Sequence, residues 1–195
     1  MTDRGTLILV VGPSGAGKDS IITGAAERCR DRRIVFAPRL ITRPAIAGGE
    51  GHIPVSPSEF AEWRDTGRLM LYWNAYGFDY GLPQELAAAL EQGSTVIANV
   101  SRMVLTEARR RFPPVAVVSV AASPATLAAR LAIRGRETAS DMARRLKRAG
   151  ALAAAKPDFI IDNNGTLEVA VDRFVEVLRE VLERPAPLAA DLQTA

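Results

Sequence analysis

The amino-acid sequence predicts an α/β fold, a three-layer sandwich in which helices cover both faces of a parallel sheet. Short and almost wholly apolar runs recur at residues 6–11, 94–100, 115–120 and 158–162. Each run is followed by a stretch with the apolar spacing of a helix. Strands buried on both faces of a parallel sheet have this continuous apolar character, and their alternation with helices is typical of βαβ units.

The composition of the chain narrows the class of protein. The 195 residues have 48% hydrophobic and 24% charged side chains, a net charge of +3 and one cysteine, Cys29. A single cysteine excludes an intrachain disulfide scaffold, and no apolar run approaches the roughly 18 residues of a membrane span. The chain lacks the basic stripe with interleaved aromatic residues that is typical of nucleic-acid binders. We therefore expect a cytoplasmic protein that binds small anions.

The first apolar run leads directly into the segment GPSGAGKDS at residues 12–20. This segment fits the phosphate-binding P-loop pattern G-x-x-x-x-G-K-[ST] except at its last position, where Asp19 replaces the hydroxyl residue. A strand, a glycine-rich turn and a helix in this order form an anion site at the helix N-terminus. We expect that helix over about 19–30. The predicted ATP-binding residues of the loop are Gly12, Pro13, Ser14, Gly15, Ala16, Gly17, Lys18, Asp19 and Ser20.

Capping residues mark other helix starts. The segment SPSE at 56–59 is a capping-box pattern with proline at the first helical position, and Ser123-Pro124 predicts another start. The last helix is expected over 167–183, with an apolar stripe that packs in the core. The members of this stripe are Leu167, Val171, Phe174, Val175 and Leu178.

Three further segments follow the loop in an order known from one family. ITRPAIAGGEGH (41–52), YGFDYG (76–81) and RGRETASDMARRL (134–146) are similar to the acceptor segment, the Gly-x-x-Tyr-Gly motif and the lid of the guanylate kinase family of P-loop nucleoside monophosphate kinases. The loop of that family likewise begins Gly-Pro-Ser-Gly. With these four segments the whole chain resembles this family.

The resemblance implies a single guanylate-kinase-like domain over residues 1–185. Within it we expect an inserted acceptor-binding lobe at about 36–92 and an arginine-rich lid at about 134–146. Residues 186–195 have no hydrophobic period, so we expect a disordered tail.

The departures from the family pattern concern the acceptor. Arg43 matches the first phosphate-binding arginine, but Ile46 stands about where the second would be. Leu71 stands at the place of the carboxylate that recognises the edge of guanine, and Leu82 replaces the Thr or Ser after Tyr-Gly. Tyr80, which the resemblance assigns to phosphate binding, remains. The sequence therefore predicts a kinase that keeps phosphate binding and has lost base recognition.

Such a kinase would act on a small sugar phosphate. The "GKDS" loop and the "ITR…H" segment resemble the ribose 1,5-bisphosphate phosphokinases associated with phosphonate degradation. This resemblance covers essentially residues 5–180. The resemblance implies transfer of the γ-phosphoryl group of ATP to the 1-phosphate of ribose 1,5-bisphosphate, with 5-phosphoribosyl 1-diphosphate (PRPP) and ADP as products. The expected partners are ATP and the sugar phosphate. The sequence is compatible with a monomer and with a homodimer.

Two alternatives remain. If a carboxylate such as Asp79 takes the place of Leu71, the chain is a guanylate kinase that converts ATP and GMP into ADP and GDP. A non-catalytic guanylate-kinase-like binding module is the second alternative, although Lys18 and the arginines of the lid speak against it.

The metal ligands are predicted from Asp19 and its surroundings. The family carries an acidic residue at the end of the strand that corresponds to 94–100, where this chain has Asn99. We hypothesise that Asp19 supplies the anionic oxygen for Mg²⁺ and Asn99 a neutral partner, with Ser20 as the competing ligand. One carboxylate with phosphates and water is a usual environment for Mg²⁺.

The lid and the one histidine complete the predicted site. The resemblance implies that Arg134 and Arg136 contact ATP and that Arg145 bridges the donor and acceptor phosphates. Lys18, Arg136 and Arg145 are therefore the predicted catalytic residues. His52 lies in the acceptor segment. Two roles are compatible with this place, a contact to the substrate phosphate and a structural hydrogen bond. The predicted acceptor-binding residues are Arg43, His52, Tyr80 and Arg145.

Overall fold

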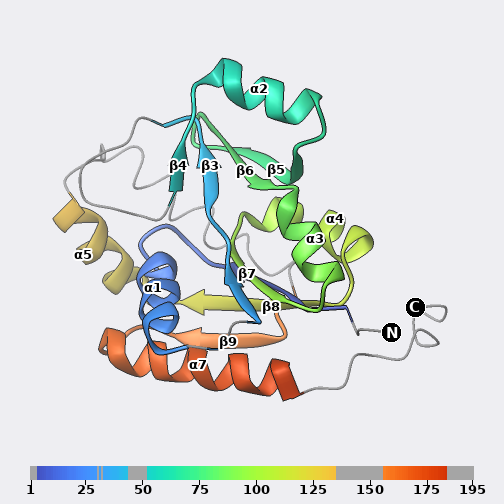
Figure 1. Ribbon diagram of the computed structural model, residues 1–195. Coiled ribbons are helices and arrows are strands. Elements are labelled where there is room, and N and C mark those ends of the chain that lie inside the picture. The colour runs from blue at the N-terminus through green and yellow to red at the C-terminus, as the bar shows by residue number, and fades with distance from the viewer. Residues whose placement is uncertain (1–3, 30, 32, 44–51, 135–155, 184–195) are drawn as a thin grey trace.

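The structure is a computed structural model and describes residues 4–29, 31, 33–43, 52–134 and 156–183 (Figure 1). Its core is a five-stranded parallel sheet in the order β2-β7-β1-β8-β9. The strands of this sheet are β1 (Leu7–Val11), β2 (Ile34–Phe36), β7 (Thr95–Asn99), β8 (Val115–Ala121) and β9 (Phe159–Asp162). All four predicted strands lie in it, which confirms the predicted fold class.

Strand β2 was not predicted. It has three residues and pairs with β7 in parallel through Ile34 and Thr95. A run of three residues carries too little period to be recognised, and only its place at the sheet edge makes it a strand.

Helices cover both faces of the core sheet (Figure 1). Helices α1 and α7 pack on one face, and α3 and α4 pack on the other. The described helical segments are α1 (Lys18–Arg28), α2 (Pro57–Asp65), α3 (Glu85–Glu91), the 3₁₀ turn η1 (Arg102–Val104), α4 (Leu105–Arg111), α5 (Pro124–Arg134) and α7 (Leu167–Glu183). None of these helices has the length and apolar character needed to span a bilayer.

The continuous apolar run of β1 follows from its place at the centre of this sandwich. Ile8 and Val10 point into the cluster under α1 and α7, and Leu7 and Leu9 point into the cluster under α3 and α4. Alternate residues of a strand face opposite sides, so a strand covered on both sides has no polar face.

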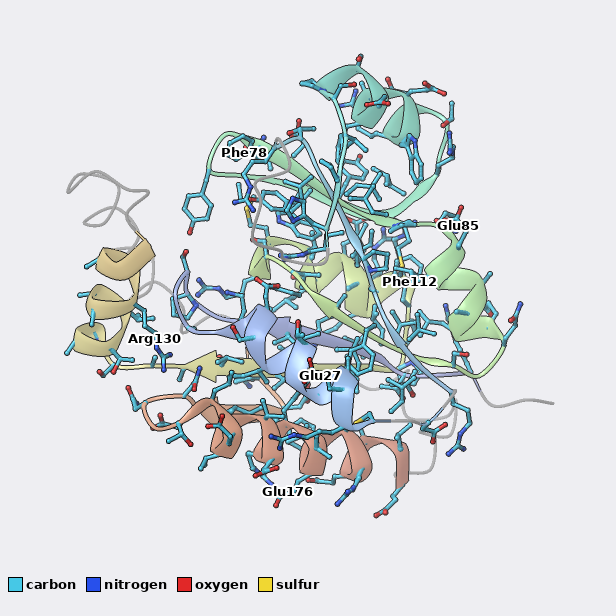
Figure 2. All side chains as sticks on the ribbon, turned by 60° about the vertical axis from the view of Figure 1, so that its left-hand side comes forward. Glu27, Phe78, Glu85, Phe112, Arg130 and Glu176 are labelled. Atoms are coloured by element: carbon cyan, nitrogen blue, oxygen red, sulfur yellow. The ribbon has the colours of Figure 1, made fainter. Side chains whose placement is uncertain are left out.

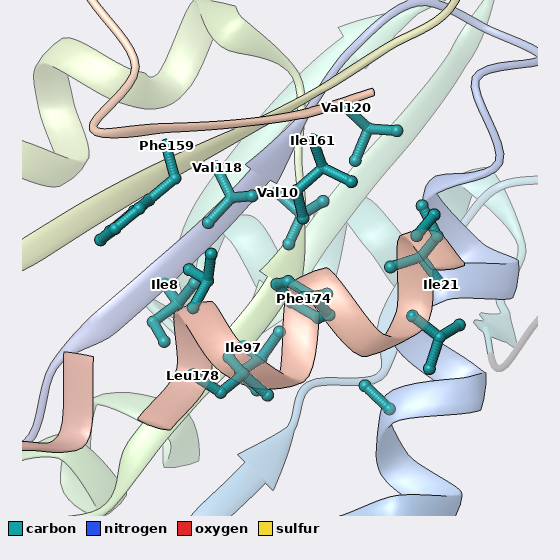
Figure 3. Close-up of a cluster of buried hydrophobic side chains, with 14 of the residues drawn as sticks. Ile8, Val10, Ile21, Ile97, Val118, Val120, Phe159, Ile161, Phe174 and Leu178 are labelled. Carbon is teal, nitrogen blue, oxygen red and sulfur yellow. The ribbon is translucent and has the colours of Figure 1, made fainter. Parts of the chain in front are cut away.

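The predicted stripe of the last helix packs in the core except at its first residue. Phe174 is fully buried among the residues of β1, β7, β8 and β9 (Figure 3). Val171, Val175 and Leu178 are also buried, but Leu167 is 40% exposed. Leu167 begins α7, ahead of the part that lies under the sheet, so its assignment to the core was wrong.

A second, smaller sheet stands above the core and carries α2 (Figure 1). Its order is β4-β3-β6-β5, with β3 (Arg39–Ile41), β4 (His52–Pro54), β5 (Leu69–Ala75) and β6 (Phe78–Pro83). Helix α2 begins with the predicted capping box, in which Glu59 N–H donates to Ser56 Oγ at 3.2 Å and Ser56 N–H to Glu59 Oε2 at 2.7 Å.

Candidate functional site

The glycine-rich loop connects the C-terminal end of β1 to the start of α1. Gly17 caps α1 in the left-handed region, with φ of 88°. A Cβ at Gly17 would lie 2.4 Å from Asn163 Nδ2, and one at Gly12 would lie 2.3 Å from the Val120 carbonyl oxygen. Both positions therefore require glycine, because neither the backbone angle nor the surrounding atoms leave room for a side chain.

Lys18 is the first residue of α1 and folds back over the loop. Its Nζ donates to the carbonyl oxygens of Gly12 and Pro13, each at 2.9 Å. The ammonium group is thereby held at the N-terminal end of α1, where helix dipole and backbone N–H groups already favour anions. This arrangement suits the phosphates of a nucleotide.

The Asp19 carboxylate contacts Asn99, as predicted, and also Arg39, which was not predicted as a site residue. Its Oδ1 accepts hydrogen bonds from Asn99 Nδ2 at 2.6 Å and from Arg39 Nη2 at 2.7 Å. Arg39 comes from β3 of the smaller sheet and its side chain is only 11% exposed. Register explains the Asn99 contact, since Asn99 ends β7 beside Val10 of β1.

The predicted metal ligands are thus partly assembled. Asp19 and Asn99 lie together, whereas Ser20 is exposed at the next position of α1. Asp19 Oδ2 receives no hydrogen bond from the described residues. Among these residues no group of three or more His, Cys, Asp or Glu side chains forms a metal cage, so a cation here would need phosphate oxygens and water as further ligands.

Two further residues lie against the loop and were not predicted as site residues. Asn163 follows β9, is 2% exposed, and donates from Nδ2 to the Ala16 carbonyl oxygen at 2.8 Å. Arg130 lies on the side of α5 that faces the core (Figure 2), with Nη1 3.9 Å from the Cβ position of Gly17. Asn163 Oδ1 and Arg130 Nη1 are buried without a hydrogen-bond partner among the described residues.

Three of the four predicted acceptor residues, Arg43, His52 and Tyr80, lie on or next to the smaller sheet. Tyr80 of β6 stacks on Trp73 of β5, with ring centroids 5.5 Å apart and planes 5° from parallel. His52 begins β4 and pairs with Arg39 of β3, and Arg43 follows β3 by two residues. Both ring nitrogens of His52 are buried and have no hydrogen-bond partner in the described part of the chain.

Leu71 and Leu82 form a direct cross-strand pair, and both side chains are 0% exposed. Tyr80 lies on the same face as this pair, because side chains alternate along β6. Asp79 therefore points to the opposite face, where its Oδ1 accepts from Asn74 Nδ2 at 2.8 Å. The face that carries Tyr80 thus has an apolar pair at the positions assigned to base recognition.

The predicted lid lies mostly outside the described residues. Arg134 is the last residue of α5. Arg136 and Arg145 fall in the segment 135–155, outside the described part of the chain.

Comparison with known proteins agrees with this architecture. The family model for guanylate kinase matches residues 4–183. A ribose 1,5-bisphosphate phosphokinase of Acidiphilium cryptum is 44% identical over 186 residues, which are 95% of this chain and 98% of that protein. One of Rhizobium etli is 41% identical and covers 92% of both chains.

Two other relatives are much longer. A bifunctional ribose 1,5-bisphosphokinase-thymidine phosphorylase of Cupriavidus pinatubonensis is 45% identical over 92% of this chain, which spans only 30% of that protein. A second one, from Cupriavidus necator, is also 45% identical, and this chain spans 32% of its length.

A solved guanylate kinase of Anaplasma phagocytophilum has a TM-score of 0.72 at 17% identity, covering 94% of this chain and 89% of its own. At 17% sequence identity, this similarity shows a shared fold alone. The family match and the relatives confirm the resemblance that the motifs indicated: the chain belongs to the guanylate kinase family.

Proposed function

We propose that the protein transfers the γ-phosphoryl group of ATP to the 1-phosphate of ribose 1,5-bisphosphate, with PRPP and ADP as products. Relatives that match the chain over nearly their whole length are named for a ribose 1,5-bisphosphate phosphokinase activity. The structural observation that carries the proposal is the buried pair of Leu71 and Leu82.

The Leu71–Leu82 pair disfavours the binding of a nucleobase in the acceptor site. A buried donor without a partner costs about 1–3 kcal/mol, and a site built to bind such donors discriminates by roughly 10⁴–10⁵ against ligands that do not match. Leu71 and Leu82 offer no acceptor to the guanine edge, and Asp79 faces the other side of the sheet. GMP should therefore be a poor acceptor, while Arg43, His52 and Tyr80 suit a phosphate.

The chain's own groups would act mainly by positioning and by neutralising charge, as phosphoryl transfer requires. The loop 12–17 cradles the phosphates of ATP, and Lys18 reaches them from the start of α1. The acceptor phosphate has a second pKa of about 6, so it is already a nucleophile at neutral pH. No general base is needed. Arg136 and Arg145 are assigned by the family resemblance to close over the transferred group.

A magnesium ion fits the residues present. Asp19 Oδ2 and the Asn99 amide oxygen are hard oxygen ligands beside the loop, with the Ser20 hydroxyl as the alternative. The ion would neutralise charge on the transferred phosphoryl group.

Guanylate kinase activity is the second candidate, because the family model and a solved structure of the same fold carry that name. Against a non-catalytic module stands the placement of Lys18 over the glycine loop, where its Nζ donates to the Gly12 and Pro13 carbonyl oxygens.

The test measures ADP release from ATP and Mg²⁺ with ribose 1,5-bisphosphate and with GMP as separate acceptors. We expect turnover with the sugar bisphosphate, and Lys18→Met should remove it. Turnover with GMP alone would establish a guanylate kinase. Failure to bind ATP would favour the binding module.

A further inference from the structure

The proposed acceptor has two phosphates. Arg43, His52 and Tyr80 are proposed above to bind the 1-phosphate, which receives the phosphoryl group. Ribose 1,5-bisphosphate carries a second phosphate at the other end of the sugar. A charged group of this kind needs its own cationic partner, and an arginine is the residue best suited to it. Such a residue should lie near the loop and the smaller sheet and should lack an acidic partner.

Arg102 meets these conditions by its place in the fold. It begins η1, three residues after Asn99, at the C-terminal end of β7. Val100 N–H donates to the Val10 carbonyl oxygen at 3.1 Å, so this end of β7 lies beside the end of β1 that leads into the glycine loop. Ligands of open parallel sheets bind at this edge.

The turn that carries Arg102 packs against the smaller sheet. Val100 and Val104 on either side of it are 4% and 3% exposed and belong to the same apolar cluster as Leu71 and Leu82. Ser101 Oγ accepts from Met103 N–H at 3.4 Å and closes the turn. The turn that carries Arg102 is thus packed between the core sheet and β5 of the smaller sheet.

The Arg102 guanidinium makes no ion pair or hydrogen bond with the described residues. Two arginines of the following helix are paired instead: Arg109 lies 3.6 Å from Asp158, and Arg111 lies 2.7 Å from Glu107. Burial lowers the pKa of the Arg102 guanidinium from its ordinary value, and the Tyr76 hydroxyl opposes this change. A half-buried cation without an anion is costly, and an anionic ligand would remove that cost.

The nearby turn of the smaller sheet is also unusual. Tyr76, between β5 and β6, has φ of 55° and is the one described residue other than glycine with positive φ. Left-handed backbone costs a residue with a side chain about 1–2 kcal/mol, and such strain tends to persist at ligand sites. The Tyr76 hydroxyl acts electrostatically on the Arg102 guanidinium, so the strained turn between β5 and β6 lies near the unpaired arginine.

We propose that Arg102 binds the 5-phosphate of the acceptor and so selects a sugar bisphosphate over a sugar monophosphate. The proposal rests on the proposed function. Arg102 is a specificity-determining residue here, since it would lie at the far end of the sugar from the transferred group.

The test compares Arg102→Gln with the wild type on ribose 1,5-bisphosphate and on ribose 1-phosphate, which lacks the 5-phosphate. We expect kcat/KM for the bisphosphate to fall about 10- to 100-fold, the effect of losing hydrogen bonds to a charged group, mainly through KM. The values for ribose 1-phosphate and the KM for ATP should not change. Arg102→Lys should restore part of the loss, and Arg110→Gln, an exposed arginine on α4, is the matched control.

A second measurement does not depend on turnover of ribose 1-phosphate. Ribose 5-phosphate should inhibit the wild type competitively against the bisphosphate, and Arg102→Gln should raise its inhibition constant by the same factor. An unchanged inhibition constant, or an equal loss with both acceptors, would overturn the role of Arg102. If the wild type does not phosphorylate the bisphosphate at all, the proposed function itself is wrong, and the two failures are thus distinguished.

Discussion

Asp19 Oδ1 and Arg39 Nη2 lie 2.7 Å apart in a largely buried ion pair that joins the phosphate loop to the smaller sheet. Asp19 stands on the first turn of α1 and Arg39 on β3, so the pair links the proposed donor site to the proposed acceptor site. Asn99 donates to the same carboxylate oxygen at 2.6 Å. The replacement of the usual loop hydroxyl by a carboxylate is therefore matched by a cation from another part of the fold.

Arg39→Met should destabilise the protein. The substitution keeps the volume of the side chain but leaves the Asp19 carboxylate with Asn99 alone, and a lost hydrogen bond to a charged group costs about 1.5–3 kcal/mol. Urea unfolding measures this loss. The double variant Arg39→Met with Asp19→Asn should be more stable than Arg39→Met, because no unpaired charge remains. Equal stability of wild type and single variant would show that the pair contributes nothing.

Asp19→Ala tests the proposed magnesium ligand. We expect kcat to fall about 100-fold or more, since a metal supplies several kcal/mol of charge stabilisation in such reactions. Initial rates at saturating ATP over a range of Mg²⁺ concentrations check this, with Ser20→Ala as the comparison. Full activity of Asp19→Ala at saturating Mg²⁺ would exclude the carboxylate as a ligand and leave Ser20.

Gly17→Ala should weaken ATP binding. An alanine at φ of 88° costs about 1–2 kcal/mol, and its Cβ would lie 2.4 Å from Asn163 Nδ2. The loop has to move, and a loss of 1.4 kcal/mol already corresponds to about tenfold in Kd. Titration calorimetry with ATP measures the effect. Gly165→Ala is the control, because no atom lies within 4 Å of its Cβ position, and it should bind ATP normally.

Stability should depend on pH through the capping box of α2. Hydrogen bonds from the Ser56 side chain and then its backbone hold the pKa of Glu59 below its ordinary value of 4.5. A carboxyl group whose pKa is lower in the folded than in the unfolded state adds stability above its unfolded pKa and loses it as the pH falls through the folded value.

Thermal unfolding of wild type and Glu59→Ala from pH 7 to pH 3 measures this dependence. We expect the wild type to be more stable at pH 7 and the difference to shrink below about pH 4.5. The Glu59→Gln variant carries no titratable group at this position. The stability difference between Glu59→Gln and Glu59→Ala should therefore stay constant from pH 7 to pH 3. A constant difference between wild type and Glu59→Ala would contradict the prediction.

Much of the fold was predictable because its signals are local. The apolar runs of β1, β7, β8 and β9 and the capping box before α2 each involve residues that are close in sequence. The glycine loop was recognised in the same way, since a short motif encodes its backbone shape. The assignment of Leu167 to the core failed because a helical stripe does not tell where the helix leaves the sheet.

By itself, the sequence determined four of the five strands of the core sheet and their alternation with helices, the phosphate loop and the family of the chain. Only the tertiary structure brought Arg39, 20 residues away, and Asn99, 80 residues away, to the Asp19 carboxylate, and Asn163 to the loop from 147 residues away. No short sequence motif predicts these contacts, because they join residues that are far apart in the chain. They form where the parallel strands end at one edge of the core sheet and where the smaller sheet packs beside it. Charge compensation in this site is thus a property of the fold, since it depends on which distant side chains share a buried space.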